Sequence, residues 1–137
     1  MDQIARQWID SAVMASPVAK SMGMTLVAAE ADSVVLALPF ADHLTTTPGT
    51  LHGGVVAALV DTAGAAASAS GLTAGDEATG GATSNLSVTY LAPARTGLRA
   101  TATVVHRARS STHTQVAVRD ADGRLVASGY VDSRIFH

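Results

Sequence analysis

One segment, residues 50–70, carries the groups best suited to chemistry. Asp61 is its only charged side chain apart from a histidine, and the residues around it are mostly Ala, Leu and Val. Burying an unpaired carboxylate is costly, so a functional reason for Asp61 is expected. Gly53 and Gly54 open the segment, and the first amide groups of a helix lack intrahelical partners and can hold negative charge. The segment thus combines a carboxylate that needs a functional explanation with free amides that can bind negative charge.

The spacing of these groups indicates that one chain cannot use both together. At about 100° per residue, the apolar stripe of the predicted helix consists of Val55, Val56, Leu59, Val60, Ala63 and Ala66. Asp61 lies on another face with small neighbours, which a ligand or a second backbone can approach closely. Gly53 and Asp61 are separated by about 12 Å along the helix axis. Two copies related by a twofold axis would bring the glycines of one to the carboxylate of the other. We therefore predict a site shared between subunits.

Composition indicates a single domain, residues 1–137, that associates with itself. The chain is 47% hydrophobic but only 4% aromatic, so its core must be built from Val, Leu and Ala. Charged residues make up 15%, below the roughly 25% that is usual for soluble domains. A surface this poor in charge is expected to be partly hidden in a homo-oligomer, a dimer that pairs with a second dimer into a tetramer.

Charge and residue usage also exclude several classes of function. The formal net charge of −2 gives no general attraction to nucleic acid or to an anionic membrane. The chain has no Cys, which excludes thiol catalysis and thiolate metal sites, and its other His residues show no ligand-like spacing, so no metal is expected. The polar, acid-containing N-terminus does not resemble a signal peptide, and the apolar segment around Asp61 is too weakly hydrophobic for a membrane span. We expect a cytoplasmic protein.

The order of elements predicts an α+β fold. A short amphipathic helix is expected within residues 2–15, and it should end near Ser16-Pro17. Strands follow at residues 22–31 and 33–40, joined by a tight connection around Asp32, and then a Thr-rich loop and the long helix. Four further strands are predicted at residues 82–91, 98–108, 112–119 and 125–135, and we expect them to form consecutive hairpins. One long apolar helix must be covered by a sheet. The predicted architecture is a curled antiparallel sheet wrapped around one central helix.

Two sequence motifs resemble a known family. The segments GTLHGGVVAALVDTAG and TSNLSVTYLAPAR are similar to those of the hotdog-fold acyl-CoA thioesterases of the phenylacetate-degradation (PaaI) type. The likeness extends over residues 38–134, and it combines a His-Gly-Gly sequence, an Asp nine residues after the His, and a later Tyr-x-x-Pro-Ala sequence. It implies a hotdog fold and hydrolysis of an acyl-CoA, with coenzyme A entering as part of the substrate and no separate cofactor.

The resemblance also implies roles for single residues. The Gly53 amide would polarise the thioester carbonyl, His52 would act in positioning, and Asp61 would be the catalytic carboxylate. Thr83 occupies a position where the family often has Ser or Thr that helps to hold the carboxylate or a water. Thr46 stands where relatives commonly carry Asn or Gln, and its shorter hydroxyl bears on substrate range. The residues expected to contact substrate are Gly54, Thr62 and Asn85.

Three alternatives stay open from the residues themselves. Asp61 is either a nucleophile or a general base, since both roles need it within reach of the carbonyl. A hydratase or dehydratase of the same fold would need an acid/base pair, but His52 and Asp61 lie about 180° apart around the helix. A non-catalytic acyl-CoA-binding module would not need the carboxylate. The C-terminal half is rich in Arg, which is suited to the phosphates of coenzyme A, and Trp8 is expected to anchor the N-terminal helix or cover the acyl group.

Overall fold

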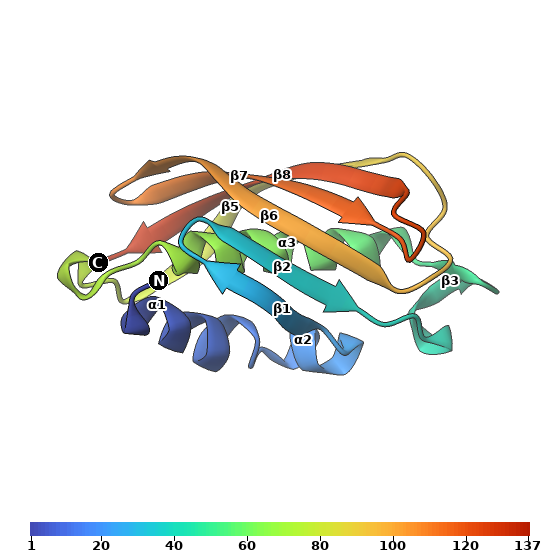
Figure 1. Ribbon diagram of the computed structural model, residues 1–137, viewed down its shortest axis with the longest axis horizontal. Helices are drawn as coiled ribbons and strands as arrows, with labels where there is room; N and C mark the ends of the chain where they lie inside the picture. The colour runs from blue at the N-terminus through green and yellow to red at the C-terminus, as the bar shows by residue number, and fades with distance from the viewer.

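The computed structural model describes all 137 residues, Met1–His137. Its helices are α1 (Gln3–Trp8), the π-helix η1 (Ile9–Val13), α2 (Pro17–Met22), the 3₁₀ turn η2 (Asp42–Leu44), α3 (Gly53–Ser70) and the 3₁₀ turn η3 (Ala74–Asp76). Its strands are β1 (Thr25–Glu30), β2 (Ser33–Leu38), β3 (Thr45–Thr47), β4 (Thr50–Leu51), β5 (Gly80–Tyr90), β6 (Leu98–Ala108), β7 (Ser111–Arg119) and β8 (Leu125–Phe136). Figure 1 shows α3 running along one face of the sheet, with the N-terminal helices beside it. The predicted α+β fold with one long central helix is confirmed.

The main sheet has six antiparallel strands in the order β1-β2-β6-β7-β8-β5. The predicted hairpins β1–β2, β6–β7 and β7–β8 are present, and the last turns at Gly123 with φ of 80°. The predicted hairpin between β5 and β6 is wrong, because β5 pairs with β8 and β6 pairs with β2. Their connection contains Pro93 and spans residues 91–97, which is longer than a two-residue hairpin turn and lets β5 cross to the far edge. Strand β5 therefore ends the sheet and leaves one side unpaired.

The apolar stripe of α3 forms the centre of the core. All six predicted stripe residues are buried, and they pack with inward side chains of the sheet strands. On the other side of the helix, some of the small residues pack against the sheet and others stay half-exposed. Gly64 lies against Val131 of β8, where a Cβ would come within 2.5 Å of the valine side chain. The predicted close approach is thus made, at that position, by the chain's own sheet. Asp61, Thr62 and Ala65 remain half-exposed.

The N-terminal region is more elaborate than one amphipathic helix. Residues 3–13 form α1 and η1, and a second helix, α2, then begins at Pro17. Ser16, expected to mark the end of helical structure, instead caps α2 by accepting a hydrogen bond from the Ala19 amide at 3.2 Å. A proline in the first turn of a helix loses no helical hydrogen bond, so the Ser-Pro pair starts a helix here. All three N-terminal helices pack against α3.

Helix α3 is the one helix that is long and apolar enough to cross a membrane by length and composition. In the structure 61% of this segment is buried, as befits the core helix of a globular fold. The Thr-rich loop before it contains the short hairpin β3–β4, which delivers the chain to the start of the helix.

Candidate active site

Asp61 is held from the edge strand. Thr83 on β5 donates its hydroxyl hydrogen bond to Oδ1 of Asp61 at 2.6 Å. Strand β5 has a register irregularity between Thr83 and Asn85, where it pairs with β8. The bond leaves the second carboxylate oxygen, Oδ2, without a partner in the chain. The structure thus brings together two predicted site residues that lie 22 positions apart.

A cavity of about 430 Å³ opens beside this pair. Asp61 and Thr83 form part of its wall, together with apolar side chains of α3 and of the N-terminal helices. Trp8 and Val13 close it on the N-terminal side, while Leu72 and Ile135 line it elsewhere. A mostly apolar cavity with a few convergent polar groups is the usual form of a small-molecule site. Trp8 lines this cavity, and its covering of an acyl group stays a prediction.

His52 caps the N-terminal end of α3, where Gly53 and Gly54 lie. His52 is the N-cap residue, and its Nδ1 accepts a hydrogen bond from the Gly54 amide at 2.8 Å. A ring nitrogen that accepts carries no proton, so the neutral ring has its proton on Nε2. The amide of Gly54 is therefore occupied. The amide of Gly53 donates to no group in the chain and stands at the positive end of the helix dipole.

Tyr90, the last residue of β5, completes this end. Its hydroxyl donates to the carbonyl oxygen of Gly53 at 2.6 Å. The sequence marked Tyr90 only as part of a motif and assigned it no role. Residues seven positions apart on a regular strand point to opposite faces, so the spacing of Thr83 and Tyr90 did not indicate a shared contact with α3. The register irregularity after Thr83 changes this alternation, and both side chains bond to α3.

The two ends of the site are separate within one chain. Gly53 begins α3 and Asp61 lies two turns further on, about 12 Å along the axis. A thioester carbonyl that contacts the Gly53 amide cannot also reach Asp61 of the same helix. Each chain thus carries two candidate half-sites, the Asp61 carboxylate and the Gly53 amide, and side chains of the exposed edge strand β5 bond next to both.

The remaining predicted residues lie apart from Asp61 or are occupied. Thr62 lines the cavity, but its hydroxyl donates to the Ala58 carbonyl at 2.7 Å. Asn85 points to another partner, Oδ2 of Asp132, at 3.4 Å. Thr46 is exposed on the β3–β4 hairpin, near the helix start in the chain rather than at Asp61. Their proposed contacts with substrate stay predictions.

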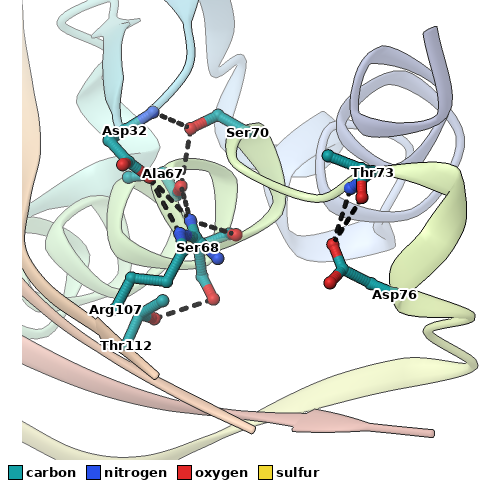
Figure 2. A network of polar contacts seen from close by, with 8 residues as sticks. All are labelled: Asp32, Ala67, Ser68, Ser70, Thr73, Asp76, Arg107 and Thr112. Carbon is teal, nitrogen blue, oxygen red and sulfur yellow. Dashed lines mark hydrogen bonds and ion pairs between the residues drawn. The ribbon is translucent and has the colours of Figure 1, made fainter. Parts of the chain in front are cut away.

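Arg107 is one of the arginines considered for phosphate binding, and it serves the fold instead. Its guanidinium bonds to the carbonyl oxygens of Ala67 and Ser68 at the C-terminal end of α3, at 3.3 and 2.8 Å. It also forms an ion pair with Asp32 at 2.8 Å, and Thr112 donates to the Ser68 hydroxyl at 2.8 Å (Figure 2). Cations near a helix C-terminus satisfy its free carbonyls and complement its dipole. Arg107 therefore fixes the far end of the helix that carries Asp61.

The loop after α3 contains the one carboxyl group with a clear shift in acidity. Asp76 accepts a hydrogen bond from the Thr73 amide at 2.7 Å and another from the Thr73 hydroxyl at 3.1 Å (Figure 2). The backbone hydrogen bond is the main cause that holds the pKa of Asp76 below its ordinary value, and partial desolvation opposes it. This carboxylate stabilises a loop and takes no part in the site.

The histidines outside the site are dispersed. His113 pairs with Asp132 at 2.5 Å and stacks on Tyr130, with ring centroids 5.0 Å apart. His137 contacts the backbone carbonyls of Asp76 and Arg109. No group of three or more His, Asp and Glu residues lies together as a metal site would require. That the protein works without a metal stays a prediction.

The fold and the site together define a class of protein, the hotdog-fold thioester hydrolases. Residues 48–127 match the family model of the thioesterase superfamily. Human acyl-coenzyme A thioesterase 13 is 30% identical over 133 residues, which cover 94% of this chain and 92% of that protein. The chain belongs to the thioesterase superfamily.

Solved structures support the same assignment. A thioesterase family protein from Silicibacter pomeroyi superposes with a TM-score of 0.88 at 25% identity, over 96% of this chain and 98% of that one. The PaaI protein of the E. coli phenylacetic acid degradation operon superposes with a TM-score of 0.85 over 99% of this chain and 96% of that one. Its identity is 21%, so this likeness shows the fold. The predicted hotdog fold is confirmed.

Proposed function

We propose that this protein hydrolyses an acyl-CoA thioester at a site shared by two copies of the chain. In each site, Asp61 of one subunit would work opposite the Gly53 amide of the other. The observation that carries the proposal is the pairing of Asp61 with Thr83 at the wall of an apolar cavity, combined with a free amide at the start of the same helix. The human relative is named an acyl-coenzyme A thioesterase, which supports coenzyme A as the thiol.

The edge strand supports the twofold arrangement. Strand β5 is eleven residues long, and all of it except Gly80 and Val88 is exposed. An unpaired edge of this length invites a second strand. A second copy that added its own β5 antiparallel to the first would extend the sheet and bring the two α3 helices side by side. The half-exposed Ala57 and Ala58, midway between Gly53 and Asp61, would then lie near the axis.

The chemistry follows from the two half-sites. The carbonyl oxygen of the thioester would accept a hydrogen bond from the Gly53 amide, which stabilises the negative charge that develops there. With Oδ1 of Asp61 held by Thr83, Oδ2 is left to act. It either removes a proton from a water that attacks the carbonyl carbon, or attacks that carbon itself to form an anhydride that water then opens. In both routes the C–S bond breaks, the thiolate leaves and takes up a proton, and the free acid is released.

The cavity bounds the acyl group. A volume of about 430 Å³ with largely apolar walls suits a small or medium acyl group, aromatic ones included. The hydratase alternative is less favoured, because its candidate acid/base partner His52 is engaged as the N-cap of α3, where its Nδ1 accepts a hydrogen bond from the Gly54 amide. The binding-module alternative differs in a measurable way, since it would release no thiol.

The test is release of free thiol from a panel of aromatic, short and medium-chain acyl-CoAs. Asp61→Asn keeps the size of the side chain and its contact with Thr83 but removes the charge, so kcat should fall by at least about a thousandfold while acyl-CoA still binds. Asp10→Asn, on the exposed N-terminal helix, is the matched control and should hydrolyse as the wild type does. Hydrolysis by Asp61→Asn at the wild-type rate would refute the proposal. The dimer, its pairing into tetramers and the cytoplasmic location stay predictions.

A further inference from the structure

We infer that Tyr90 is a positioning residue that fixes the oxyanion-binding amide of Gly53, an inference that rests on the proposed function. Tyr90 is 53% exposed, yet its hydroxyl makes a 2.6 Å hydrogen bond to the Gly53 carbonyl. Its ring stands beside this glycine, with Cζ 3.4 Å and Oη 3.5 Å from the position that a Cβ would occupy. The side chain thus fills the space next to the residue whose amide is free.

The hydrogen bonds around Gly53 show what Tyr90 contributes. The peptide group before Gly53 is fixed through the His52 carbonyl, which accepts from the amides of Val55 and Val56 at 2.9 and 3.2 Å. The peptide group after it is fixed by two side chains, since its carbonyl accepts from Tyr90 and its N–H donates to His52. Glycine has no Cβ to restrict its backbone, so such external contacts decide its orientation. With both neighbouring peptide groups held, the direction of the Gly53 N–H is set.

The segment that follows β5 makes a second hydrogen bond to the chain near the start of α3. The Ala94 carbonyl, four residues after Tyr90, accepts a hydrogen bond from the Leu51 amide at 2.8 Å. Tyr90 and Ala94 therefore bind residues 53 and 51, on either side of His52. This contact gives a physical reason for the Tyr-x-x-Pro-Ala sequence that follows β5. Because Thr83 on the same strand bonds to Asp61, one strand contacts both candidate reactive groups of α3, the Gly53 peptide and the Asp61 carboxylate.

Because Tyr90 orients the Gly53 amide and does not itself contact the substrate, loss of its hydroxyl should lower kcat more than it changes KM. Oxyanion stabilisation depends on a donor held at the correct position before the charge develops. Loss of the Tyr90 hydroxyl leaves the amide in place but lets its peptide neighbours tilt. Complete removal of an oxyanion donor costs about 10²–10³ in kcat, so loosening one should cost about tenfold. Ground-state binding of the acyl-CoA does not need this precision, so KM should change little.

The experiment compares Tyr90→Phe with Tyr130→Phe. Both changes remove one exposed hydroxyl from the sheet, but Tyr130 lies on β8 and stacks on His113 away from Gly53. Tyr90→Phe keeps the ring that packs on Gly53, so folding should be retained, and thermal unfolding checks this. We expect kcat for thiol release to fall about tenfold with KM within about threefold for Tyr90→Phe, and no change for Tyr130→Phe.

A double-mutant cycle with Gly53→Pro separates positioning from a general structural effect. Proline removes the Gly53 N–H, so there is then no donor for Tyr90 to position, and Tyr90→Phe should have no further effect. Wild-type kcat in Tyr90→Phe, an effect on KM alone, or an equal loss in both backgrounds would each overturn the inference. If Gly53→Pro by itself leaves kcat unchanged, the proposed function of the amide fails. If Gly53→Pro is impaired and Tyr90→Phe is not, only the inference about Tyr90 fails.

Discussion

The Gly53 amide can be removed without removing the helix that it begins. Gly53 is the first residue of α3, where an N–H has no intrahelical partner, so proline costs no helical hydrogen bond. The residue before a proline must be extended, and His52 already is, with φ of −62° and ψ of 136°. Gly53 is not among the residues with positive φ, so a side chain is compatible with its backbone. Gly53→Pro is therefore expected to fold.

The alanine variant is the matched control. A Cβ at position 53 would lie 3.4–3.6 Å from the Tyr90 ring, which is ordinary van der Waals contact, and the N–H would be kept. Loss of one oxyanion donor typically raises the activation free energy by about 2.7–4 kcal/mol. Gly53→Pro should consequently lower kcat by about 10²–10³, while Gly53→Ala keeps most of its activity.

The assay is steady-state thiol release from one acyl-CoA, with circular dichroism and thermal unfolding as measures of folding. If the proline variant is folded and turns over as fast as the alanine variant, the Gly53 amide does not stabilise the transition state. If the alanine variant is as impaired as the proline variant, the site is sensitive to the Cβ rather than to the N–H. Either result would refute the role that we assign to this amide.

Three further changes test other parts of the structure. Thr83→Val removes the hydroxyl bound to Asp61 and should lower kcat by about 10–100-fold, whereas Thr83→Ser keeps it and should stay near wild type; equal losses would contradict the hydrogen-bond role. Arg107→Met leaves the carbonyls at the end of α3 unpaired and should reduce the free energy of unfolding by about 2–3 kcal/mol in urea titrations, while the exposed Arg99→Met should have almost no effect. The pKa of Asp76 is lowered in the folded chain, so its stabilising effect is present above its ordinary pKa of 3.8 and is lost as the pH falls through the folded value. Asp76→Ala should therefore be less stable than wild type at neutral pH and equally stable in strong acid; an undiminished difference in acid would contradict this.

Much of the fold could be predicted because its elements have strong local patterns. The limits predicted for β6, residues 98–108, agree with the structure, and α3 buries the stripe that its periodicity indicated. The partner of β5 could not be predicted, because alternation of apolar and polar residues shows that a strand exists but not which strand lies beside it. Ser16-Pro17 was equally ambiguous, since the same pair ends one helix and begins another.

The site was predictable in part for a similar reason. Asp61 and the glycines stand out within one helix, where an acid among small apolar residues conflicts with local preference. The contact with Thr83 came from family resemblance alone, since no local rule relates residues 22 positions apart. The hydrogen bond from Tyr90 to the Gly53 carbonyl was missed, because it depends on β5 running back along α3 from Asp61 to Gly53. Long-range contacts of this kind follow from the pairing of strands, which the sequence did not reveal.

The claim that two subunits share each site can be tested by mixing two inactive variants. Asp61→Asn lacks the carboxylate and Gly53→Pro lacks the amide, so each should be nearly inactive alone. In a shared site, a mixed dimer has one doubly impaired site and one intact site. Co-expression or refolding of equal amounts makes half of the dimers mixed, so about one quarter of the wild-type thiol release per chain should return. A mixture that forms mixed dimers, verified with two different affinity tags, yet stays as inactive as its components would contradict the account.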